Sequence, residues 1–95
     1  MADRQGCPPQ ENLVFFRGNI LDNGQVIRSG VTGEMEAKMV GTLMERNGYF
    51  DLPPGPIGLA QSRRYELRLD DGQAFTFFIT NINPGEHVVR VFFAV

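Results

Sequence analysis

The sequence predicts an all-β fold, a single small antiparallel barrel or sandwich of about six or seven short strands. Its 95 residues are the length of one domain, which excludes a doubly wound enzyme fold and a large barrel. Short apolar runs are separated by turn signals such as Asn-Gly and Asp-Gly. The eleven glycines are scattered along the chain, as turns and bulges require.

The first part of the chain is predicted to be an arm followed by a hairpin. Residues 1–11 are polar and Pro-rich without periodicity, which indicates a flexible N-terminal arm. Residues 12–95 then form the single β domain. Residues 13–20 are an apolar run typical of a strand, and residues 22–24 (Asp-Asn-Gly) are a strong turn signal. The return strand begins near residue 26.

Residues 34–46 fit two different elements. As a helix they place Met35, Met39 and Leu43 on one face, and the domain would then be α+β. As a strand, the same apolar residues alternate with charged ones. The Val-Gly-Thr sequence inside this segment suits a helix interior poorly, so we favour the strand. A hairpin turn at residues 47–48 (Asn-Gly) would follow it.

The clearest hairpin spans residues 63–80. A two-residue loop at residues 71–72 would place charged side chains beside aromatic ones on one face. A three-residue loop at residues 70–72 instead pairs Leu67 with Phe75 and gathers the apolar side chains on one face. A slip of one residue exchanges the two faces, so the hydrophobic pattern selects the second register.

Aromatic residues also fall on faces where polar residues are expected. In this register Phe78 lies on the polar face near Arg64, and the last strand places Phe92 beside Arg90 on its second face. Phe16 is a further candidate, because the first strand is apolar on both faces. These rings exceed what one thin core accommodates, so they predict a second face that is covered by a partner.

From this surplus we expect a non-catalytic interaction or assembly module. It would be a homo-oligomer, with a second copy of the chain or another protein as its partner. Single-stranded nucleic-acid binding by a small OB-like or SH3-like barrel is the alternative, with Arg64 and Arg68 along the backbone path and the exposed rings for stacking. The formal net charge of −2 disfavours nucleic acid as a partner.

The sequence contains no motif for catalysis or metal binding. His87 is the single histidine and Cys7 the single cysteine, which leaves no evident nucleophile–base pair and no set of metal ligands. We therefore expect no catalytic residue, no metal and no cofactor. A small-ligand pocket under the Pro-rich loop at residues 53–58 is the second alternative function, with Tyr49, Asp51 and His87 as its polar groups.

The sequence gives no sign of a membrane or secretory address. It has no apolar stretch long enough to span a bilayer, and its first residues lack the apolar centre of a signal peptide. We therefore expect a cytoplasmic location and no membrane partner.

Overall fold

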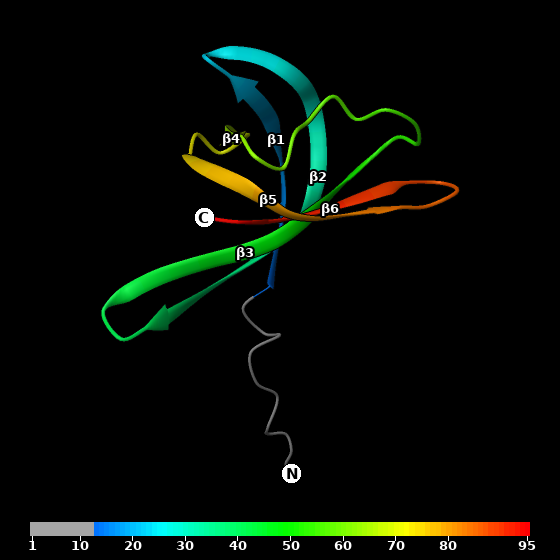
Figure 1. The fold of residues 1–95 in the computed structure, drawn as a ribbon. Helices are drawn as coiled ribbons and strands as arrows, with labels where there is room; N and C mark the ends of the chain where they lie inside the picture. The colour runs from blue at the N-terminus through cyan, green and yellow to red at the C-terminus, as the bar shows by residue number, and fades with distance from the viewer. Residues whose placement is uncertain (1–12) are drawn as a thin grey trace.

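Six antiparallel strands close into a barrel in the computed structural model, which describes residues 13–95 (Figure 1). The order of the strands around the barrel is β1-β2-β3-β6-β5-β4, so β1 pairs with both β2 and β4. The predicted all-β fold is confirmed, and it is a closed barrel. The predicted flexible arm lies outside the described residues. The strands are β1 (Leu13–Asp22), β2 (Gln25–Val40), β3 (Leu43–Leu52), β4 (Arg64–Leu69), β5 (Ala74–Pro84) and β6 (Val89–Ala94).

Two of the predicted hairpin turns are confirmed. Between β1 and β2, Asn23 and Gly24 both have positive φ, at 53° and 79°, which is the geometry of a type I′ turn. Between β4 and β5, Leu67 pairs with Phe75, as the three-residue loop requires. Gly72 supplies the positive φ of that loop, at 97°.

Residues 34–46 form strands and a turn, and the helix alternative is wrong. β2 continues through this segment, and the turn into β3 lies at residues 41–42, where Gly41 has a φ of 65°. The turn predicted at residues 47–48 is also wrong, because both residues lie inside β3. A Cβ atom on Gly48 would collide with the backbone carbonyl oxygen of Glu34. Glycine is needed there because two strands approach closely, not because the chain turns.

The interior of the barrel is filled by apolar side chains from all six strands. Phe50, Phe77 and Phe93 are at most 2% exposed, and their ring centroids lie 5.4 to 5.9 Å apart. No polar or charged residue is buried among the side chains of residues 13–95 that the structure describes. The core is therefore complete within one chain. Its remaining members are Phe16, Ile20, Val31, Leu52, Tyr65, Leu67, Leu69, Ile79, Val89 and Val91.

Phe16 is part of this core, so the prediction that placed it on the outer face is wrong. It is 5% exposed, and its ring centroid lies 6.1 Å from that of Phe93. It pairs with Gly33 of β2, which has no side chain to compete for this part of the interior. The apolar run at residues 13–16 has no alternation, so the sequence alone could not select its inner face.

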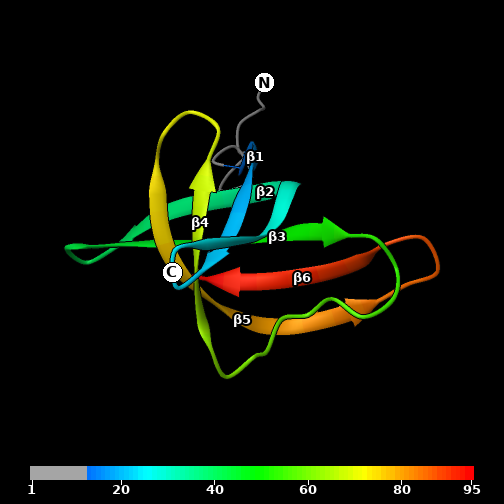
Figure 2. The ribbon, with the colours of Figure 1, turned by 90° about the horizontal axis from the view of Figure 1, so that it is seen from above.

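The hairpin of β2 and β3 projects from one end of the barrel (Figure 2). β1 accompanies β2 as far as the pair Leu13–Glu36, and β6 accompanies β3 only from Asn47 onward. Residues 37–46 therefore extend beyond their neighbouring strands, and we call this segment the finger. Its side chains include the exposed Met39 and Leu43.

The opposite end of the barrel is covered by the β3–β4 loop, residues 53–63. Arg28 of β2 donates hydrogen bonds to the carbonyl oxygens of Pro56 and Ile57, at 3.2 and 2.7 Å. The Tyr65 hydroxyl accepts a hydrogen bond from the backbone N–H of Ala60 at 2.8 Å. These contacts fasten the loop onto the barrel, and we call this side the loop end.

Candidate functional site

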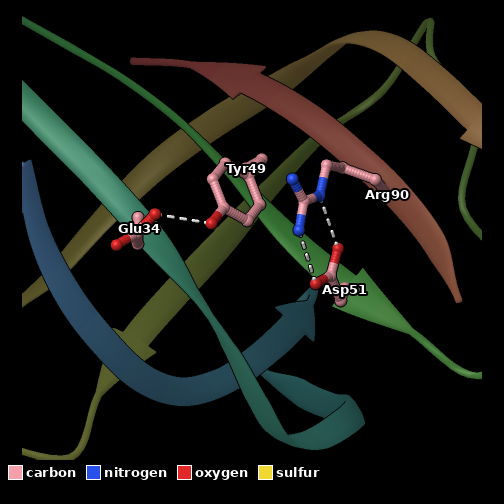
Figure 3. Close-up of polar contacts among 4 residues, drawn as sticks. All are labelled: Glu34, Tyr49, Asp51 and Arg90. Carbon is pink, nitrogen blue, oxygen red and sulfur yellow. Dashed lines mark hydrogen bonds and ion pairs between the residues drawn. The ribbon is translucent and has the colours of Figure 1, made fainter.

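Four polar and aromatic side chains form one connected network on the outer face of β2, β3 and β6 (Figure 3). Arg90 donates to both carboxylate oxygens of Asp51, at 2.9 and 3.1 Å. The guanidinium carbon of Arg90 lies 3.9 Å from the centroid of the Tyr49 ring, and the Tyr49 hydroxyl donates to Glu34 at 2.6 Å. The network follows from the register, because Asp51 pairs with Arg90 and Glu34 pairs with Tyr49.

The contacts of the network raise the pKa of two of its members, Tyr49 and Arg90. The hydrogen bond to the Glu34 carboxylate raises the pKa of Tyr49, and burial acts in the same direction. The hydrogen bond to Asp51 raises the pKa of Arg90. At neutral pH the phenol is therefore protonated and the guanidinium charged, so neither group is suited to proton transfer. The arrangement joins three strands through hydrogen bonds, an ion pair and a cation–π contact.

Of the predicted outer-face rings, Phe92 adjoins this network and Phe78 lies beside Arg64. Phe92 is half-buried, and its ring centroid lies 6.2 Å from that of Tyr49. Phe78 is 36% exposed, and the guanidinium of Arg64 lies 5.2 Å from its ring centroid. Both rings lie outside the core, as predicted, but each is partly covered by a neighbour in the same chain.

Three of the seven arginines in residues 13–95 have a carboxylate oxygen within 3.0 Å. Arg68 contacts Glu66 at 3.0 Å, Arg63 contacts Asp22 at 2.8 Å, and Arg90 is paired with Asp51. These pairs compensate the positive charge that a nucleic-acid backbone would need. Arg64 and Arg68 both point outward from β4, but Glu66 lies between them in the strand.

The proposed polar pocket groups are not brought to one hollow. Tyr49 and Asp51 are engaged in the outer-face network, whereas His87 is exposed in the segment between β5 and β6. A hollow of about 400 Å³ lies beside Pro53 at the loop end. Asp51 lines it, but Tyr49 and His87 do not.

A second hollow, at the base of the finger, was not predicted. It has a volume of about 340 Å³ and lies beside the beginning of β1. Its apolar lining includes Phe16, Met35 and Leu69, and charged side chains including Arg46 and Asp70 stand at its edge. We call this hollow the groove.

Several exposed apolar side chains lie at the finger end, and two of them, Val14 and Phe15, line the groove. Val14 and Phe15 of β1 are 59% and 67% exposed, and Met39 and Leu43 of the finger are 58% and 67% exposed. Leu13, at 42%, lies at the start of the same strand. The apolar side chains at the finger end are therefore individually more exposed than Phe78 and Phe92, two of the rings that the sequence predicts on the outer face.

β1 also has a free backbone edge at the groove. β4 pairs with β1 only from Gly18 to Leu21, whereas β2 pairs with β1 from Leu13 onward. Below Gly18, the one backbone contact from the β4 side is the N–H of Asp70, which donates to the carbonyl oxygen of Arg17 at 2.9 Å. Within the described part of the chain, the rest of this edge has no strand beside it. Such an edge is a template for pairing with another chain.

The described residues offer no metal site and no membrane-crossing helix. In residues 13–95, no three His, Cys, Asp or Glu side chains lie close enough to hold a metal ion together. No helix in this part of the chain is long and apolar enough to cross a bilayer. Comparisons of the chain with protein-family models, with curated proteins and with solved structures find no match.

Proposed function

We propose that this protein is a non-catalytic assembly module that self-associates through the finger end of its barrel. The observation that carries the proposal is the number of exposed apolar side chains at the finger end, two of which, Val14 and Phe15, line the groove. Leu13, Val14, Phe15, Met39 and Leu43 are each between 42% and 67% exposed. Large apolar side chains left in solvent at one end of a domain mark a candidate site for binding another protein.

The completeness of the core supports this proposal. The barrel is closed, and its interior is filled by rings such as Phe50 and Phe77. The exposed residues are therefore not the remainder of an unfinished core that a rearrangement of the same chain would bury. Association with a second copy would remove their apolar surface from water, which is the main favourable term in protein association.

Phe92 and Phe78 define a second, smaller candidate surface. Phe92 packs on Tyr49 and Phe78 lies under Arg64, so each exposes less apolar area than Phe15 does. The two surfaces adjoin, because Leu13 and Phe92 line one hollow of about 290 Å³. Separate substitutions at Phe15 and at Phe92 distinguish them.

The test is the solution mass of the chain by light scattering across a range of concentrations. We expect masses above the 10.6 kDa of a monomer for the wild type. Phe15→Asp introduces a charge into the proposed contact and should shift the chain toward monomer, with at least a tenfold rise in dissociation constant. Val26→Asp is the matched control, because Val26 is 53% exposed at the other end of β2. Its mass should equal that of the wild type.

Other outcomes would redirect or overturn the proposal. A clean monomer at high concentration would overturn it. Loss of association in Phe92→Asp but not in Phe15→Asp would move the contact to the outer face. Binding to single-stranded oligonucleotides that weakens as salt rises, with no self-association, would replace assembly by the nucleic-acid alternative.

A further inference from the structure

The free edge of β1 presents backbone groups of definite residues. The carbonyl oxygen of Arg17 accepts a hydrogen bond from Asp70, so the backbone groups of Arg17 point toward the β4 side. Successive residues of a strand point their backbone groups alternately to its two sides. The N–H and C=O groups of Leu13 and Phe15 therefore also point to this edge, where no strand of residues 13–95 meets them.

The finger presents a free edge of its own. The carbonyl oxygen of Arg46 accepts a hydrogen bond from the N–H of Val95 at 2.9 Å, on the side where β6 ends. By the same alternation, the backbone groups of Met44 point to this side. β6 pairs with β3 only from Asn47 onward, so this stretch of the finger has no strand partner within the described residues.

We propose that the finger of a second copy adds as an antiparallel strand to the free edge of β1 and inserts its Leu43 into the groove. The inference rests on the self-association proposed above and names its contact. Antiparallel pairing of the two free edges places Phe15 opposite Met44 of the second copy. Residues that lie directly opposite share a face, so Leu43 of the second copy then lies on the side of Phe16, which is the groove side.

The chemistry of the two surfaces is complementary. Leu43 is 67% exposed in the isolated chain, and the groove offers Phe16, Met35 and Leu69 as an apolar lining. Glu45 is exposed on the same face of the finger as Leu43. In the proposed pairing it lies opposite Val14 on the groove side of the second molecule, three residues along β1 from the contact between Asp70 and Arg17. The charged lining of the groove comprises Arg17 and Arg46 as well as Asp70 and Asp71. A buried aliphatic anchor gives affinity to such a contact.

The lengths of the two edges also agree. The part of β1 without β4 is Leu13–Arg17, and the part of the finger strand without β6 is Leu43–Arg46. In the proposed pairing the turn of the finger lies next to the β4–β5 turn at Asp70. The added strand therefore continues along the edge of β1 from the point where β4 ends. Two β1 edges would not pair as well with each other, because the Asp70 turn beside Arg17 limits the contact from both sides.

Disulfide cross-linking between two single-cysteine variants tests this pairing. Both variants carry Cys7→Ser, and one adds Val14→Cys while the other adds Glu45→Cys. In the proposed pairing, residue 14 of one chain lies directly opposite residue 45 of the other. The two residues form a non-hydrogen-bonded pair, because the backbone groups of each point to a strand of its own chain. Pairs of this type bring the Cβ atoms within disulfide distance. One variant is isotopically labelled, so mass spectrometry identifies which chains are joined.

We expect the cross-link in the mixture only, between one chain of each kind. Neither variant alone should form it, and Glu45→Cys mixed with a Val26→Cys variant should not form it. If the wild type self-associates but the mixture gives no specific cross-link, the strand-addition model is overturned and the proposed function stands. If the wild type is a monomer at every concentration, both fail.

The variant Phe15→Pro tests whether the backbone N–H of Phe15 contributes to self-association. The N–H of Phe15 points to the free edge, so its removal leaves the β1–β2 ladder intact. We expect self-association to weaken at least tenfold in this variant and less than threefold in Phe15→Val, which keeps the N–H. Equal association of the two variants would contradict strand addition. If Phe15→Pro loses its β-sheet signal in circular dichroism, the cross-link decides the question alone.

Discussion

The two ends of the barrel differ in how far other parts of the same chain cover them. At the loop end, residues 53–63 fold back over the barrel and are held by Arg28 and by the hydroxyl of Tyr65. At the finger end, β2 and β3 run past their neighbours and leave Met39 and Leu43 in solvent. The loop end is therefore covered by contacts within one chain, whereas the finger end leaves apolar side chains in solvent, and we propose that a second copy covers them.

The largest expected effect comes from matched substitutions at the two ends of one strand. Leu52 lies at the loop end of β3 and is 3% exposed, and Leu43 begins the same strand at 67% exposure. Leu52→Ala should lower the free energy of unfolding by about 2–5 kcal/mol, because it leaves a cavity in the core. Leu43→Ala should change the stability of the monomer by less than about 0.5 kcal/mol.

Denaturant unfolding at low protein concentration measures both values without a contribution from association. An equal decrease in the free energy of unfolding in the two variants would contradict the difference between the covered loop end and the exposed finger end. The reverse ranking is expected for self-association, where Leu43→Ala should have the greater effect.

A smaller effect is expected from the contacts that fasten the loop. Arg28→Lys retains the charge but loses the planar guanidinium that reaches both carbonyl oxygens. It should cost about 1 kcal/mol and raise hydrogen exchange in the backbone of residues 53–63. Arg17→Lys is the matched control at the finger end, since Arg17 is 64% exposed on its side chain and its nearest carboxylate oxygen is 4.0 Å away. Protection of the loop that is unchanged in Arg28→Lys would show that Arg28 does not hold it.

The smallest effect is expected midway between the two ends, at Tyr49. The hydrogen bond to Glu34 raises the pKa of Tyr49 in the folded chain above its ordinary value of 10.0. The resulting stabilisation is fully present below about pH 10, and it is lost as pH rises through the folded pKa. The measurement is the denaturant midpoint at about pH 9 and at about pH 11. Between these two pH values the midpoint should fall more in the wild type than in Tyr49→Phe. Parallel pH profiles of the two proteins would exclude this linkage.

The sequence predicts the strands where the hydrophobic pattern is unambiguous. In β4 and β5, one-sided alternation selects a single register, and the pairing of Leu67 with Phe75 confirms it. At the beginning of β1 the chain is apolar on both faces, so the inward position of Phe16 depends on how the barrel closes. The Asn47-Gly48 pair resembles a turn signal, but a close approach between two strands requires that glycine.

The candidate site is less accessible to sequence reasoning than the fold. The alternation along the last strand predicts that Arg90 lies near the ring of Phe92. The structure adds the contacts of Arg90 with Asp51 and Tyr49, and the hydrogen bond from Tyr49 to Glu34. The free edge of β1 depends on the difference in length between β2 and β4, which have 16 and 6 residues. A pattern within a single strand carries no information on where its neighbours stop. The groove follows from that difference, so it appears only once all six strands are placed.

The way the barrel closes also has a consequence for how the chain folds. Residues 13–52 and residues 64–94 each form a three-stranded meander of consecutive hairpins, and the β3–β4 loop joins the two. Only the pairings of β3 with β6 and of β1 with β4 connect the two meanders. Hairpins form in about microseconds, whereas pairings between distant segments must first overcome the entropy of closing a long loop.

We therefore expect the docking of the two meanders to limit the folding rate. Until they dock, Phe50 and Phe93 lie on separate half-sheets, and the edges of β1, β3, β4 and β6 are all unpaired. Aggregation during refolding should accordingly originate in this half-closed state and decrease when the meanders meet quickly. A shorter or stiffer β3–β4 connection is then a means of accelerating folding that leaves every strand unchanged.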